Sequence, residues 1–202
     1  MAKSKLTAEL IDGATPLDPD EMAGLKFKHI TVRQQLDELE QANIVQGMLW
    51  LKKHNRQNYL TIDFTLALHK ALFGQVWQWA GSFRTTEKNI GIDPLHICVA
   101  LRNLLDDVTV WAQYNSYPPQ EAILRFHHKL VQIHPFPNGN GRFSRIFADL
   151  IAQQVFQCRT VQWGGRALDK VSQVRMDYIK ALRQADAGDL EPLMLLYSDE
   201  LK

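Results

Sequence analysis

Apolar residues recur at helical spacing along most of the chain. The clearest stretch follows Asp93-Pro94, where apolar side chains return at alternating steps of four and three, as on one buried helix face. Its apolar positions are Ile97, Leu101, Leu104, Val108 and Trp111. Similar stripes predict helices over residues 18–24, 31–53, 61–73, 119–134, 139–156, 167–187 and 190–200. The pattern predicts an all-α fold preceded by an irregular arm over residues 1–17.

Capping residues set the predicted helix boundaries. Asp18 and Glu21 flank Pro19 as at a helix N-terminus. Thr31 with Gln34 would form a capping box at the next helix. The buried face of that helix is expected at Leu36, Leu39, Met48 and Leu51.

Residues 82–92 depart from the helical pattern. Threonines, glycines and aromatic residues replace the apolar stripe, and this composition predicts a small β-hairpin flap. Trp77 and Trp79, just before it, are expected to anchor the core or the loop. Lys88 is expected to face solvent.

Composition narrows the class of protein. The 202 residues suit one domain, and 23 Lys+Arg against 22 Asp+Glu give a net charge of +1, so direct nucleic-acid binding is not predicted. Cys98 and Cys158 form no CxxC pair, which argues against a structural zinc site and predicts two buried free thiols. The N-terminal stretch lacks the apolar core of a signal peptide, and no apolar run could span a membrane, so a cytoplasmic protein is expected.

The segment over residues 133–145, IHPFPNGNGRFSR, carries the candidate chemistry. Two glycines at a helix start let the backbone approach a ligand, and the unpaired amides there bind anions, phosphate above all. Arg142 and Arg145 share one helix face and could both bind a polyphosphate. His134 stands just before this loop, and its reference pKa near ~6.5 suits a general base. The combination favours a phosphate site with an adjacent base over an ordinary helix–loop–helix corner.

Two further histidines precede this segment. His127 and His128 lack the acidic partner and the spacing of a zinc site. One is expected to be a structural hydrogen-bond donor and the other to lie at the surface.

Residues 134–145, HPFPNGNGRFSR, resemble the Fic-domain motif HxFx(D/E)GNGRxxR. Every defining position matches except Asn138, where many members have Asp or Glu. Family-like segments also occur at Trp79-Ala80-Gly81 with Arg84 and over residues 126–136 and 178–193, so the resemblance covers roughly residues 25–200. The run over residues 30–44 is most similar to the mobile mystery protein B subgroup.

The resemblance implies a Fic-fold helical bundle over residues 25–202, with residues 1–24 as an arm and short helix. It implies a protein adenylyltransferase that transfers AMP from ATP to a Ser, Thr or Tyr hydroxyl of a target protein, with Mg²⁺. The flap, with Thr85 and Thr86, would align the target by strand-like pairing.

The family roles carry over onto the motif. His134 would be the base, and Phe136 would anchor the loop. The anion hole for the α- and β-phosphates would comprise Gly139, Asn140 and Gly141, while Arg142 would hold the β-phosphate region and Arg145 the γ-phosphate. Asn138 would be a poorer Mg²⁺ ligand than an acid. Doc-type kinases have a lysine where Gly141 stands, which favours AMP transfer here.

A second family feature is an inhibitory helix with the pattern (S/T)xxxE(G/N). The best candidate lies in the helix over about 31–53, with Glu40 as the inhibitory residue and Arg145 as its expected partner. Leu36 and Gln41 depart from the pattern, and a solvated acidic turn is the alternative.

Two other functions stay open. One is a different nucleotide-dependent transfer, or the removal of AMP. The other is a catalytically weak nucleotide-binding protein in a toxin–antitoxin-like pair, for which the subgroup resemblance suggests a small helix-turn-helix partner. Homo-oligomerisation is also compatible with the family.

Overall fold

The computed structural model describes residues 18–54, 58–165, 168 and 172–197. Helices dominate this part of the chain, which confirms the predicted helical class. In chain order they are α1 (Pro19–Ala23), α2 (Arg33–Lys53), α3 (Ile62–Phe73), the 3-10 turn η1 (Pro94–His96), α4 (Ile97–Tyr114), α5 (Pro119–Ile133), α6 (Asn140–Gln154), α7 (Gln173–Asp186) and α8 (Glu191–Tyr197).

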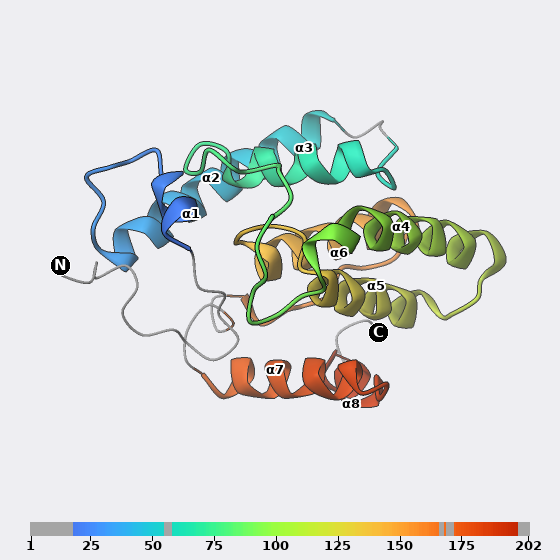
Figure 1. Ribbon diagram of the computed structural model, residues 1–202. Coiled ribbons are helices and arrows are strands. Elements are labelled where there is room, and N and C mark those ends of the chain that lie inside the picture. The colour runs from blue at the N-terminus through green and yellow to red at the C-terminus, as the bar shows by residue number, and fades with distance from the viewer. Residues whose placement is uncertain (1–17, 55–57, 166–167, 169–171, 198–202) are drawn as a thin grey trace.

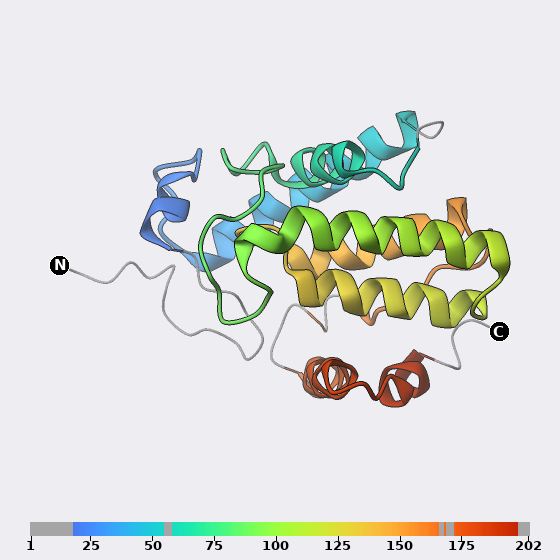
Figure 2. The ribbon, with the colours of Figure 1, turned by 45° about the vertical axis from the view of Figure 1, so that its right-hand side comes forward.

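The helices pack as three groups (Figures 1 and 2). α2 lies along α3, and α5 sits between α4 and α6 in the middle of the molecule. α7 and α8 form a pair that contacts α5. The motif segment joins α5 to α6, so it starts and ends in the central group.

The contact between α2 and α3 depends on a glycine. A Cβ at Gly47 would lie 2.8 Å from the Ala71 carbonyl oxygen and from the Leu72 Cα, so only glycine allows this approach. Asn43 strengthens the contact, since its amide donates to the Ala71 carbonyl at 3.0 Å and accepts from the Gln75 N–H at 2.8 Å. Met48 is 38% exposed, so its predicted place on the buried face is wrong.

Most predicted boundaries that fall on described residues are confirmed within a few residues, while the predicted arm over residues 1–17 and the boundaries at 167 and 200 lie outside the described residues. Glu21 caps the start of α1 by accepting from the Asp18 N–H at 2.8 Å. Thr61 caps α3 through the Phe64 N–H. The predicted Thr31 cap is wrong, because α2 starts after Val32, which has extended backbone and no side-chain cap.

The predicted β-hairpin does not form. Among the described residues, the β-type pairing is a single antiparallel bridge between Leu25 and Trp77. Residues 82–92 are a loop of turns and bends, hereafter the flap loop (Figure 1). The Arg84 guanidinium, rather than a facing strand, binds the carbonyls of Thr86 and Ile92.

Aromatic side chains fill the core beneath the motif segment. Phe136, Phe143 and Phe147 are fully buried, and the Phe136 ring lies edge-on to Phe143 with centroids 5.0 Å apart. Trp77 is also buried, which confirms its role as an anchor.

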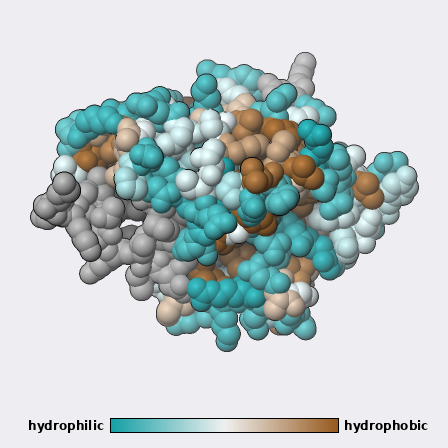
Figure 3. Space-filling model, in the orientation of Figure 1, coloured by the Kyte–Doolittle hydropathy of each residue, from teal (hydrophilic) through white to brown (hydrophobic). Residues whose placement is uncertain are grey.

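The face of the molecule seen in Figure 3 is largely polar where it is coloured, with apolar areas between polar ones. Leu95 in η1 and Val99 in the first turn of α4 are among the most exposed large apolar side chains. Cys98 beside them is exposed, so its predicted burial is wrong, while Cys158 is half-buried. No helix within the described ranges is long and apolar enough to cross a membrane.

Candidate active site

His134 occupies the residue after α5, where the sequence predicts that the helix ends. Its φ of 51° and ψ of 61° place it in the left-handed region, which is uncommon for a residue with a side chain. Its N–H still donates to the Leu130 carbonyl at 3.1 Å. The next residue, Pro135, excludes a further helical turn.

The environment of His134 favours the neutral imidazole. Burial lowers its pKa to about 4, and the nearby positive charges of Arg84 and Lys88 act in the same direction. A hydrogen bond to the Val131 carbonyl opposes them. The imidazole is therefore neutral at pH 7 and can accept a proton.

Two polar side chains hold the loop over residues 135–139, hereafter the motif loop. Asn140 closes it, because its amide oxygen accepts from the Phe136 N–H at 2.9 Å and its amide nitrogen donates to the Phe136 carbonyl at 2.7 Å. His69 on α3 stacks on the Phe136 ring, with centroids 3.6 Å apart. The loop shape is therefore set before any ligand binds.

The contacts of His69 also define its tautomer. Its Nδ1 accepts from the Gly81 N–H at 3.0 Å, so Nε2 carries the proton and donates to the Asn138 carbonyl at 3.2 Å. Burial lowers the pKa of His69 to about 3, which keeps this arrangement neutral. Nothing in the sequence marked this histidine, which lies on a predicted apolar helix face.

The two motif glycines, Gly139 and Gly141, have different surroundings. Gly139 has a φ of 78°, and a Cβ there would lie 2.8 Å from the Phe73 ring. At Gly141 a Cβ would meet only the Arg145 Nη1, at 3.7 Å. Packing therefore demands the first glycine, while the second leaves open space at the N-terminus of α6, where backbone amides can bind an anion.

Glu40 reaches this site from α2. Its Oε2 lies 2.7 Å from Nη2 of Arg142, and its Oε1 accepts from the Trp77 indole at 2.6 Å. The Glu40 side chain is 3% exposed, so the solvated-turn alternative is wrong. The expected partner was Arg145, but the ion pair goes to Arg142, the first motif arginine.

Arg145 points to a different set of groups. It interacts with the hydroxyl of Tyr178 on α7, and that hydroxyl lies 2.9 Å from Nε2 of His127. His127 and His128 are both buried, so the expected surface position of one of them is wrong. His128 instead pairs with Asp186 on α7 at 2.9 Å.

A cavity of about 680 Å³ opens beside both motif arginines. Its lining includes Arg142, Arg145, Gln41 of α2 and Asp149 of α6. Burial raises the pKa of Asp149 to about 6, although its hydrogen bonds from Trp163 and the Val161 N–H oppose the shift. Two arginines at one cavity suit a polyphosphate.

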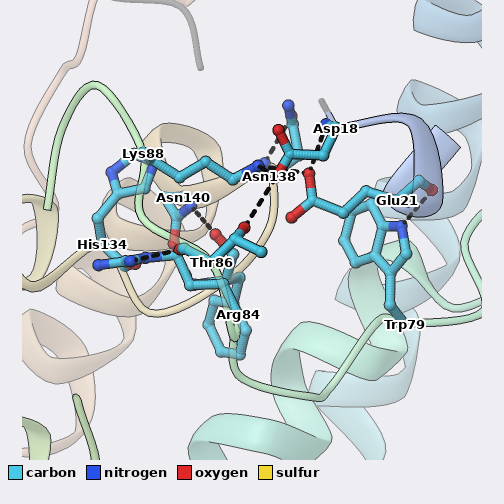
Figure 4. A network of polar contacts seen from close by, with 11 residues as sticks. Asp18, Glu21, Trp79, Arg84, Thr86, Lys88, His134, Asn138 and Asn140 are labelled. Atoms are coloured by element: carbon cyan, nitrogen blue, oxygen red, sulfur yellow. Dashed lines mark hydrogen bonds and ion pairs between the residues drawn. The ribbon is translucent and has the colours of Figure 1, made fainter. Parts of the chain in front are cut away.

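The flap loop is tied to α1 by charged groups (Figure 4). The Lys88 ammonium lies 2.8 Å from Asp18 and 2.5 Å from Glu21, and its side chain is 1% exposed. Thr86 donates to the same Asp18 carboxylate at 2.8 Å, and both Thr85 and Thr86 are exposed. The expectation that Lys88 faces solvent is therefore wrong.

The residues present do not fit a magnesium site built by the protein. The Asn138 amide oxygen is neutral and accepts the Gly139 N–H at 2.7 Å. In the part of the chain that the structure describes, no group of three or more His, Cys, Asp or Glu could hold a metal ion.

Comparisons with known proteins agree with this geometry. Residues 59–152 match the model of the Fic/DOC family. The chain is similar to protein adenylyltransferase fic-1 of Caenorhabditis elegans, at 28% identity over 71% of this chain, and to protein adenylyltransferase Fic of Drosophila mojavensis, at 30% identity over 70%. It spans 27% of the length of each of these relatives.

Solved structures share the fold. Fic-1 of C. elegans (residues 134–508) aligns with a TM-score of 0.60 and 26% identity, covering 86% of this chain and 50% of that one. BepC of Bartonella tribocorum, solved with bound AMPPNP, aligns with a TM-score of 0.65 and 20% identity, covering 94% of both chains. The motif, its geometry and these similarities agree: residues 59–152 match the Fic/DOC family model, and the described helices share the fold of solved Fic proteins.

Proposed function

We propose that this protein transfers AMP from ATP to a hydroxyl side chain of a target protein. The observation that carries the proposal is the buried, neutral His134 set directly before the glycine-rich start of α6, whose two arginines line a cavity. The similar curated proteins are named adenylyltransferases, and BepC was solved with a nucleotide analogue.

The proposed reaction assigns one proton and one leaving group. The target hydroxyl oxygen attacks the α-phosphorus, and His134 takes the hydroxyl proton. The bond from the α-phosphorus to the bridging oxygen breaks, and pyrophosphate leaves. Backbone amides at residues 139–141 would stabilise the charge that develops on the α- and β-phosphates. Arg142 and Arg145 would hold the β- and γ-phosphate regions.

We further propose that Glu40 restrains this activity. Arg142 cannot use the same guanidinium nitrogens for Glu40 and for a phosphate at once. Binding of the nucleotide would therefore compete with the contact from α2. Because Glu40 is buried and also bound to Trp77, releasing Arg142 would leave a buried carboxylate with one partner, which is costly. ATP binding would therefore require a shift of α2.

Magnesium enters this proposal only as part of the substrate, bound to the phosphates of ATP. Replacing Asn138→Asp adds a charge next to the anion site while keeping an oxygen that can accept the Gly139 N–H. We expect the variant to reach half-maximal rate at a lower Mg²⁺ concentration, because a carboxylate is the better ligand for a hard cation. An unchanged Mg²⁺ response would show that residue 138 stays away from the metal.

The flap loop is proposed to align the target segment, with Thr85 exposed at its surface. Assignment to the mobile mystery protein B subgroup, a helix-turn-helix partner and homo-oligomerisation are proposals that rest on family resemblance. A cytoplasmic location is a proposal that rests on the sequence pattern alone.

Labelled ATP tests the function. We expect label from the α-phosphate to appear on protein, and to vanish in His134→Ala but not in His29→Ala, which removes an exposed histidine. Label from the γ-phosphate would instead indicate a kinase. ATP binding without transfer, even in Glu40→Gly, would favour a nucleotide-binding partner protein.

A further inference from the structure

Arg84 is a buried cation between the flap loop and the end of α5. Its residue exposure is 2%. Its Nε donates to the His134 carbonyl at 2.6 Å, and its Nη2 lies 3.4 Å from the Ile133 carbonyl. A buried charge needs such partners, and here backbone oxygens supply them.

The other side of the same guanidinium binds the flap loop. Nη1 donates to the Thr86 carbonyl at 2.8 Å, and Nη2 also donates to the Ile92 carbonyl. The Arg84 N–H donates to the Pro135 carbonyl at 2.9 Å, so backbone and side chain hold the same junction. A planar guanidinium with five donors can join two segments in one fixed geometry, which a lysine cannot do.

The flap loop packs tightly against Arg84 and His134 at Gly91. At Gly91, whose φ is 116°, a Cβ would lie 2.6 Å from the Arg84 Nη2 and 2.8 Å from the His134 Cβ. Flap loop, guanidinium and histidine are therefore in direct contact at one point. The left-handed backbone of His134 needs such support, since it is costly by itself.

We propose that Arg84 is a positioning residue for the transfer reaction: it fixes the direction of the His134 imidazole and joins it to the flap loop. The base and the segment that would align the target hydroxyl then move as one unit. The inference rests on the proposed function, since the base role of His134 does. Figure 4 shows Arg84, Thr86 and His134 in this arrangement.

Two substitutions of Arg84 can separate its effect on the position of His134 from the effect of its positive charge. The flap loop contributes Arg84 and Lys88, and α1 contributes Asp18 and Glu21, which pair with Lys88. Arg84→Lys keeps a positive charge but loses the planar guanidinium that joins the two segments, whereas Arg84→Met loses both the charge and the guanidinium. Arg125→Met is the matched control, because Arg125 pairs with Glu121 on the surface of α5.

The experiment measures kcat and KM for ATP in the Glu40→Gly background, together with an NMR titration of the His134 imidazole. In Arg84→Lys we expect kcat to fall about 100-fold, the usual consequence of a misplaced catalytic group, with KM for ATP within about twofold of the parent. In Arg84→Met we expect the same loss and also a midpoint of the His134 titration closer to 6.5. Arg125→Met should change none of these.

The outcomes separate the two proposals. A parent kcat in Arg84→Lys, or a rise in KM for ATP as large as the fall in kcat, would overturn the positioning role. If the parent itself transfers no AMP, the proposed function fails, and the NMR titration still reports whether Arg84 sets the environment of His134. If Arg84→Met is unfolded by circular dichroism, Arg84→Ala with added guanidinium ion replaces it: recovery of rate supports the role, and no recovery in a folded protein opposes it.

Discussion

Ion pairs connect the N-terminal helices to the site at two places, and the buried member of the pair differs between them. In the α2 contact the acid is hidden, since Glu40 is 3% exposed and Arg142 is 20% exposed. In the α1 contact the cation is hidden, since Lys88 is 1% exposed and Asp18 is 42% exposed. The more exposed member of each pair is the one that can change partner.

This difference separates two kinds of contact. Under the proposed function, Arg142 would exchange Glu40 for a phosphate, and the α2 contact would compete with the nucleotide. Lys88 has no such freedom, and the α1 contact instead holds the flap loop in place. We therefore expect changes at Glu40 to affect activity and changes at Asp18 or Glu21 to affect the stability of the loop.

The largest expected effect is on activity. Glu40→Gln keeps an oxygen for the Trp77 indole but removes the negative charge that faces Arg142, so the rate of self-modification should rise about tenfold, equivalent to ~1.4 kcal/mol. The measurement is incorporation of label from α-labelled ATP. Glu38→Gln is the control on the same helix, since Glu38 is exposed and bonds only Gln34 among the contacts described. Equal rates in the parent and both variants would remove the inhibitory role.

The next effect is on stability. Glu21→Gln removes the negative charge that faces the buried Lys88 ammonium and weakens the α1 cap. The free energy of unfolding measured in urea should therefore fall by about 1–2 kcal/mol. Asp18→Asn should cost roughly half as much, because its carboxylate is more exposed. Trypsin should also cut the flap loop faster in both variants. A larger cost for Asp18→Asn than for Glu21→Gln would contradict the assignment of Lys88 as the buried member.

Added salt should weaken the α1 contact more than the α2 contact, and this effect is smaller than the two above. At 0.5 M NaCl the stability difference between Asp18→Asn and the parent should shrink by a few tenths of a kcal/mol, because exposed charges are screened. The ratio of rates between Glu40→Gln and the parent should hardly change, because Glu40 is buried. Equal salt sensitivity would mean that both contacts are equally solvated.

The smallest effect is a titration. Hydrogen bonds from Lys88 and Thr86 hold the pKa of Asp18 below its usual 3.8. A lowered pKa in the folded state means stability that is present above pH 3.8 and lost as the pH falls through the lower folded value. The α1 contact should therefore persist from pH 8 to pH 5. NMR of the Asp18 carboxyl should show a higher midpoint in Lys88→Met, and an equal midpoint would argue against the ion pair.

Local features of the site were predictable from the sequence. Pro135 ends α5 beside His134, and the glycine pattern places α6 directly after the loop, as the structure shows. These features depend on neighbouring residues. The sequence also places Arg142 and Arg145 on one helix, but it cannot tell which of them meets α2, since that depends on how two helices pack.

Long-range pairings account for what the sequence did not reveal. Lys88 stands in a polar loop and is buried only because α1, about 70 residues earlier, supplies two carboxylates. The flap loop has residues typical of a hairpin, yet the Arg84 guanidinium takes the carbonyls that a partner strand would need. Both cases involve a side chain satisfying groups that are remote in sequence.

Gly47 gives the α2–α3 contact a wider consequence. It lies seven residues after Glu40 on the same helix, and it lets the two backbones touch. An added methyl group at position 47 would act as a spacer that lifts α2 from its neighbour and draws the Glu40 carboxylate away from Arg142. Selection or engineering could thus adjust the resting activity from a position that never meets the nucleotide, by setting how closely two helices approach.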